Sequence, residues 1–146
     1  MTGQAETPIA ISLPTKIVRN KQILAEFYSR SGLTEKWLQQ RANERTRPPS
    51  KARIERARWM AKKLTGDSLR TRRGKWAIVR RGSSRSEVDA AFAQGNAMTF
   101  NAIEDMLFGS FDQRKIPYWL ASHFRTWRAI NALRAINASK EQHHEC

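Results

Sequence analysis

The chain has 146 residues, enough for one domain with a real core or for two small helical subdomains. Hydrophobic residues make up 40% of it, with five Trp and six Phe, and this content excludes a wholly disordered protein because such side chains bury enough area to offset chain entropy. The net charge of +14 indicates a polyanionic partner, nucleic acid before membrane, with solubility alone as the alternative.

The N-terminal residues 1–14 are predicted to form a flexible arm. Ile9, Ile11 and Leu13 alternate with other residues in this stretch, so a short strand lying across a partner is the alternative. A first helix is expected from Thr15. Its core-facing residues, judged by three- and four-residue spacing, are Ile17, Val18, Ile23, Leu24 and Phe27.

Residues 15–66 are predicted to form a basic helical region in which three helices follow one another. Gly32 is expected to end the first helix in the left-handed conformation, and Thr34 is expected to cap the second. The Pro-Pro step at 48–49 breaks the second helix, because proline lacks a backbone donor and biases the preceding residue to extended angles. Ser50 then caps the third helix.

Two runs within this region, GLTEKWLQQRAN (32–43) and TRPPSKARIERARWMAKKLTG (46–66), resemble the lambda-repressor-like (Cro-type) helix-turn-helix domains over residues 23–66. In that family a recognition helix is followed by a short loop with a Pro-Ser step and by a helix ending near Leu-Thr-Gly. The resemblance implies that the second helix enters a DNA major groove. The groove residues would be Thr34, Lys36, Gln39, Gln40 and Arg41, and the phosphate contacts would be Arg45, Arg47, Lys51 and Arg53. An ordinary helical hairpin with a solvated polar face is the alternative.

Residues 67–85 are the part of the chain richest in arginine and are predicted to form a wing or a linker. Within them KWAIV (75–79) is β-prone, which allows one short β-hairpin or a single strand near 75–80. A basic ribbon here would lie on the phosphate backbone and add affinity with little sequence information. The expected contacts are Arg70, Arg72, Arg73, Lys75, Arg80 and Arg81. A flexible linker between two halves is the alternative.

Residues 86–138 are predicted to be a helical packing or dimerisation region. Ser84 or Ser86 is expected to cap its first helix, and a last helix is expected from about Pro117. The apolar positions are Val88, Phe92, Met98, Phe100, Ile103, Met106, Leu107, Phe108, Trp119, Leu120, Phe124, Trp127, Ile130, Leu133 and Ile136. They are interpreted mainly as core, and secondarily as a surface in 88–136 that binds a second copy or a protein partner.

The charge divides the chain into two halves. Residues 1–85 hold 21 Lys and Arg against 6 Asp and Glu, a net charge of +15, whereas residues 86–146 hold 6 against 7, a net charge of −1. The first half is therefore expected to bind the polyanion, and the second to pack on itself or on another protein.

The chain contains no glycine-rich phosphate loop, nucleophile elbow or paired cysteine motif, so it is predicted not to be an enzyme and to need no cofactor. His123 is interpreted as structural. Residues 139–146, predicted to be a disordered tail, include His143, His144 and Cys146, but no metal site is expected there. The single cysteine, the lack of an apolar run of about 18 residues and an N-terminus unlike a signal peptide indicate a cytoplasmic protein with no membrane contact.

Together these patterns predict an all-α, mainly helical fold: a basic N-terminal half containing a helix-turn-helix and a neutral, aromatic-rich helical C-terminal half. The favoured function is a DNA-binding transcriptional regulator, with duplex DNA as its partner. One alternative is a small non-catalytic subunit of a nucleoprotein complex, for example an RNA-guided one, that binds RNA or single-stranded DNA through its arginines. In that case bases would stack on Trp37, Trp59 or Trp76. A basic adaptor for an acidic protein is the third reading.

Overall fold

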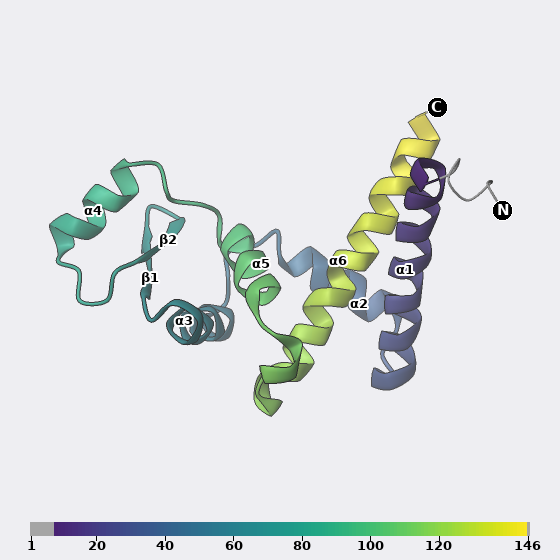
Figure 1. Cartoon of the computed structure of the whole chain (residues 1–146), viewed down its shortest axis with the longest axis horizontal. Helices are drawn as coiled ribbons and strands as arrows, with labels where there is room; N and C mark the ends of the chain where they lie inside the picture. The colour runs from purple at the N-terminus through teal and green to yellow at the C-terminus, as the bar shows by residue number, and fades with distance from the viewer. Residues whose placement is uncertain (1–7, 146) are drawn as a thin grey trace. The chain divides into compact units, whose positions relative to one another are not determined.

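A computed structural model describes the backbone of residues 8–145 and the side chains of residues 15–140. It confirms the mainly helical class with one short β-hairpin (Figure 1). The elements are α1 (Pro8–Ser31), α2 (Glu35–Glu44), α3 (Lys51–Thr65), β1 (Ser68–Arg72), β2 (Lys75–Val79), α4 (Arg85–Ala93), α5 (Phe100–Ser110), the 3-10 turn η2 (Gln113–Lys115) and α6 (Tyr118–Glu145). The helices of the described part are too short or too polar to cross a bilayer.

The chain forms two compact units, and the second is inserted into the first. Unit 1 consists of Met1–Thr46 and Tyr118–Cys146, and unit 2 consists of Arg47–Pro117. The expected regions 15–66 and 86–138 are each divided between the two units. The reason is packing: α1 and α2 bury their apolar faces against α6, whereas α3 packs against α5 and β1.

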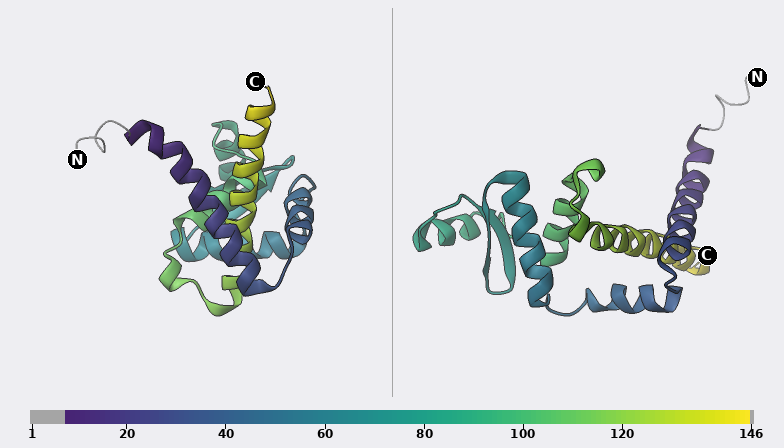
Figure 2. Two further views of the ribbon diagram at one scale, coloured as in Figure 1. Left: turned by 90° about the vertical axis from the view of Figure 1, so that its right-hand side faces the viewer. Right: turned by 90° about the horizontal axis from the view of Figure 1, so that it is seen from below.

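In unit 1, α1 and α2 pack against the last helix, α6 (Figure 2). The core of this unit is made by Leu24, Phe27, Leu38, Ala42, Ala129, Ile130, Ala132, Leu133 and Ile136. Gly32 ends α1 at φ 70°, and the Thr34 hydroxyl accepts a hydrogen bond of 3.1 Å from the Trp37 N–H. Both predicted caps are therefore confirmed. Val18 was predicted to face the core but is 52% exposed, because nine residues along a helix place it about half a turn from Phe27.

The ends of the chain differ from the prediction. Helix α1 begins at Pro8 rather than Thr15, so the predicted arm is wrong from Pro8 onward. Proline is well suited to the first position of a helix, where its missing N–H would have no partner in any case. Helix α6 continues to Glu145, so the predicted disordered tail is also wrong over 139–145. Residues 1–7 and Cys146 lie outside the described residues.

In unit 2, the hairpin lies between helices on both of its faces. Strands β1 and β2 are antiparallel, with Arg72 opposite Lys75 beside the turn, so residues 68–79 form the predicted wing and not a flexible linker. One face, with Ala77 and Val79, packs on Val88 of α4. On the other face, the ring of Trp76 meets Phe100 of α5 edge-on at 5.2 Å. At the edge of β2 away from β1, Met98 pairs with Trp76 through two backbone hydrogen bonds of 2.8 Å.

The apolar positions of 88–136 are mostly core, as predicted. Val88, Phe100, Ile103, Leu107 and Phe108 are buried in unit 2, and Leu120, Phe124, Ile130, Leu133 and Ile136 are buried in unit 1. Met98, Met106 and Trp119 are more exposed than the pattern implied. The dimer or partner interface stays a prediction.

A buried ion pair joins α3 to α5. The Arg53 guanidinium contacts both carboxylate oxygens of Glu104, at 3.2 Å from Nε and 2.8 Å from Nη2, and Nη2 also donates to Asn101 at 3.0 Å. Only 15% of the Arg53 side chain and 8% of the Glu104 side chain are exposed. The guanidinium also lies 5.0 Å from the centroid of the Phe100 ring. Each charge therefore has its partner within the fold.

We predict that Glu104→Ala lowers the free energy of unfolding by about 3 kcal/mol, because it leaves a mostly buried guanidinium without its carboxylate. Urea denaturation followed by far-ultraviolet circular dichroism measures this change. Glu55→Ala removes an exposed carboxylate from the same unit and is the matched control. Equal effects of the two substitutions would show that the ion pair does not hold α3 to α5.

Candidate nucleic-acid interface

Positive charge is concentrated in unit 2. Residues 47–117 hold 16 Lys and Arg against 7 Asp and Glu, a net charge of +9. The two segments of unit 1 hold 11 against 6, a net charge of +5. A site for a polyanion is therefore expected in unit 2, which contains the arginine-rich hairpin.

The tip of the hairpin is a two-residue turn built from Arg73 and Gly74. Both have positive φ, 52° for Arg73 and 75° for Gly74, as tight hairpin turns that match the twist of the strands require. Asn, Asp and Gly are the usual residues in such turns. A non-glycine residue with a longer side chain in this conformation costs about 1 kcal/mol. The turn therefore presents an arginine at the tip where a different residue would stabilise the fold more.

A groove lies between the hairpin tip and one face of α4, within unit 2. On the α4 side its residues are Arg85, Asp89, Phe92 and Ala93, which recur every three or four positions and so share one helix face. The hairpin contributes Arg72, Arg73 and Lys75, and Ala97 follows the end of α4. The volume of the groove is about 600 Å³. We call these eight residues the basic groove.

The cations of the basic groove are not all alike. Arg72 is fixed on two sides: Nε contacts Asp89 Oδ1 at 3.1 Å, and Nη1 donates to the Thr71 carbonyl at 2.8 Å. Arg73, Lys75 and Arg85 form no ion pair with any side chain in the described part of the chain. Four cations thus face one carboxylate, which leaves an excess positive charge of three.

Helix α4 is held at its N-terminus by a capping box. The Ser84 hydroxyl accepts from the Glu87 N–H at 3.3 Å, and the Glu87 carboxylate accepts from the Ser84 N–H at 2.9 Å. The hydrogen bond from the Ser84 backbone is the main reason why the pKa of Glu87 is lowered from its ordinary value. Ser84, rather than Ser86, is the cap. The capping box therefore fixes the start of α4, where Arg85 is the first helical residue.

The other cations of unit 2 that were predicted to contact nucleic acid differ in exposure. Arg70, Arg80 and Arg81 are exposed on or after the strands but do not line the groove. Arg47 and Lys51 are exposed before and at the start of α3. Arg53 was predicted to contact phosphate. That role is corrected, because its guanidinium is largely buried against Glu104 and Asn101.

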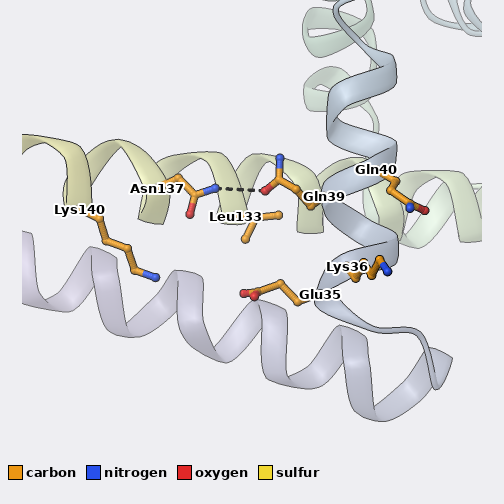
Figure 3. A pocket seen from close by; sticks show the side chains of 7 residues that line it. All are labelled: Glu35, Lys36, Gln39, Gln40, Leu133, Asn137 and Lys140. Carbon is orange, nitrogen blue, oxygen red and sulfur yellow. Dashed lines mark hydrogen bonds between the residues drawn. The ribbon is translucent and has the colours of Figure 1, made fainter.

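In unit 1, one residue of the predicted reading face of α2, Gln39, is turned toward α6. Figure 3 shows Gln39 directed at Asn137 of α6, while Gln40 projects from another side of α2. The Gln39 carbonyl oxygen accepts from Asn137 at 3.3 Å, and its amide donates to Asn43 at 3.0 Å. The shallow groove here, of about 410 Å³, also includes Glu35, Lys36, Leu133 and Lys140.

Three further residues predicted to contact DNA from unit 1, Thr34, Arg41 and Arg45, have roles within the fold. Thr34 caps α2 through its hydroxyl. Arg41 binds both oxygens of Glu44, at 2.9 and 3.0 Å, and lies 4.9 Å from the centroid of the Trp37 ring. Arg45 is buried, with 7% of its surface exposed. Lys36 and Gln40 are the exposed members of the set that have no such internal role in the described residues.

The three tryptophans that would stack on bases in the alternative of a single-strand-binding subunit are used in packing. Trp76 is 6% exposed, Trp59 stacks on Phe111 with a centroid separation of 6.0 Å, and Trp37 stacks on Phe27 at 6.4 Å. The groove residues that sequence reasoning missed are Arg85, Asp89 and Phe92. Their signal was their helical spacing directly after the Ser84 cap.

Comparison of the chain with models of known protein families, with curated proteins and with solved structures finds no match. The resemblance to Cro-type domains therefore stays a prediction. Within the described residues, no group of three or more His, Cys, Asp or Glu side chains could hold a metal ion. The side chains of His143, His144 and Cys146 lie outside them.

We predict that Arg73→Asn raises the free energy of unfolding by about 1 kcal/mol, because Asn adopts positive φ more readily than Arg. Thermal and urea denaturation measure the change. Arg70→Asn is the matched control, since it makes the same substitution at an exposed strand position, where Asn is disfavoured and a small loss of stability is expected. If both variants change stability in the same direction, the turn conformation of Arg73 does not determine the effect.

Proposed function

We propose that this chain is a non-catalytic nucleic-acid-binding protein and that the basic groove of unit 2 is its binding site. The observation that carries the proposal is the grouping of Arg73, Lys75 and Arg85, which form no ion pair in the described residues, beside an Arg72 already held in place. The proposal keeps the predicted class of partner but moves the main contacts from α2 to the hairpin and α4.

The physical basis is the phosphate backbone. Cations that neutralise phosphates release condensed counterions, and this term supplies most of the affinity that does not depend on sequence. Arginine suits the task because its planar guanidinium matches phosphate geometry. Arg72 has lost part of its conformational freedom before any ligand arrives, so less entropy is lost when it binds.

A reading head on α2 has less support. A helix that reads base edges needs amide and guanidinium groups that are free to face the groove. Gln39 is instead hydrogen-bonded at both ends of its amide, and Arg41 is paired with Glu44. The sequence-specific regulator therefore remains a prediction of the sequence, and the proposal here does not require it.

The proposal predicts that removing three groove cations weakens binding much more than removing three others. Arg73→Ala, Lys75→Ala and Arg85→Ala together should lower affinity for a fluorescent oligonucleotide at least tenfold and reduce the slope of log K against log salt by about 2. The matched control removes three exposed arginines of α6 by Arg125→Ala, Arg128→Ala and Arg134→Ala, with the same change in net charge. Fluorescence anisotropy of the full chain at several salt concentrations measures both.

Equal losses in the two triple variants would show that net charge alone, and not the groove, governs binding. An intact chain that binds an acidic polypeptide as tightly as any nucleic acid would favour the adaptor reading instead.

A second prediction uses the one carboxylate of the groove. Asp89→Asn removes its negative charge and should tighten binding roughly threefold, the size expected for one unit charge near a phosphate in water. Glu55→Gln makes the equivalent change at an exposed site on α3 and should have a smaller effect. If Asp89→Asn weakens binding instead, the hold of Asp89 on Arg72 matters more than its charge.

A further inference from the structure

We infer that the basic groove receives an unpaired nucleotide, with the base on Phe92 and the phosphates on the hairpin cations, so that the chain prefers single-stranded nucleic acid to duplex. This inference rests on the proposed function and adds the form of its ligand. It is carried by the arrangement of an aromatic ring and cations around one groove.

The first step is the position of Phe92. This side chain is partly buried and packs against the cluster of Ala77, Val79 and Val88 beneath it. Phe92 also lines the groove and is only partly buried, and from this we infer that part of its ring is open to a ligand. A ring held by a core on one side and open on the other is a rigid platform, and stacking on it costs little side-chain entropy.

The second step is that the basic groove has both apolar and cationic lining residues. Phe92, Ala93 and Ala97 give the groove an apolar part, and the two alanines are small enough to leave room beside the ring. The rim carries the cations, including Arg73 at the hairpin tip and Arg85 at the start of α4. A nucleotide combines the same two characters, a flat apolar base and a charged phosphate. The groove volume of about 600 Å³ lies within the range of roughly 300–1,000 Å³ of small-ligand sites.

The third step concerns duplex. Paired bases are stacked on one another and present only phosphates and groove edges to a protein, so Phe92 would gain little from them. A purely electrostatic site favours the duplex, because its higher charge density releases more counterions per phosphate. A preference for the single strand would therefore have to come from contacts with unpaired bases.

The fourth step is that two other aromatic side chains in the basic part of the chain are less accessible than Phe92. Trp76 is buried and Trp37 is stacked on Phe27, so neither ring has a broad open face like that of a platform. Phe92 is the aromatic residue that lines the basic groove. It is thus the residue whose loss should separate base binding from phosphate binding.

The test compares three ligands of matched length on the full chain by fluorescence anisotropy: a short oligothymidylate, the same strand annealed to its complement, and an abasic strand with the same number of phosphates. The unmodified protein should bind the oligothymidylate about tenfold more tightly than the abasic strand, and more tightly than the duplex. Because this comparison uses the native protein, it does not depend on any variant folding.

Phe92→Leu should then remove the difference in affinity between the oligothymidylate and the abasic strand, whereas Phe92→Trp should retain it. Equal binding of the abasic strand and the oligothymidylate by the native protein would overturn the inference, as would tighter binding of the duplex. The proposed function would still stand in that case if the triple groove variant loses affinity. If that variant binds as the α6 control does, the proposed function and this inference are both contradicted.

Discussion

The ion pair between Arg53 and Glu104 is the contact on which the geometry of unit 2 depends. It ties α3 to α5, and the ring of Phe100 lies between the Arg53 guanidinium, at 5.0 Å, and Trp76 of the hairpin, at 5.2 Å. A two-stranded hairpin is marginally stable by itself in water and needs packing on its faces. The ion pair fixes α3 and α5, which support one face of the hairpin. It therefore also supports the tip of the hairpin, which carries Arg72, Arg73 and Lys75.

This support explains how an arginine can occupy the hairpin turn. A residue held at positive φ persists only where the surrounding structure determines its conformation more strongly than its own preference does. Here the register of β1 with β2, the contact of α4 with Ala77 and Val79, and the pairing of Trp76 with Met98 all act on the strands next to Arg73. The stability of the core thus offsets a local cost at the tip, where the Arg73 side chain is exposed and has no partner in the described residues.

The sequence allowed the local features to be predicted and left the long-range ones open. Gly32, Thr34 and Ser50 were recognised because a cap depends on hydrogen bonds within a few residues. The partner of α3 was not, because periodicity shows that a helix has an apolar face but not which element covers it. For the same reason Arg53 was taken for a phosphate contact. A buried and an exposed arginine look alike on a helix, and its partner Glu104 is 51 residues away.

Two acidic residues of unit 2 are paired with arginines that lie far from them in the sequence. Glu104 neutralises an arginine inside the fold, while Asp89 neutralises and holds one at the edge of the groove. The rim cations beyond them repel one another, and this repulsion destabilises the compact state. A bound polyanion would remove the repulsion and would stabilise the folded form by mass action, since the unfolded chain has no groove. If the proposed function holds, folding and binding in unit 2 are linked through the same few charges of the basic groove.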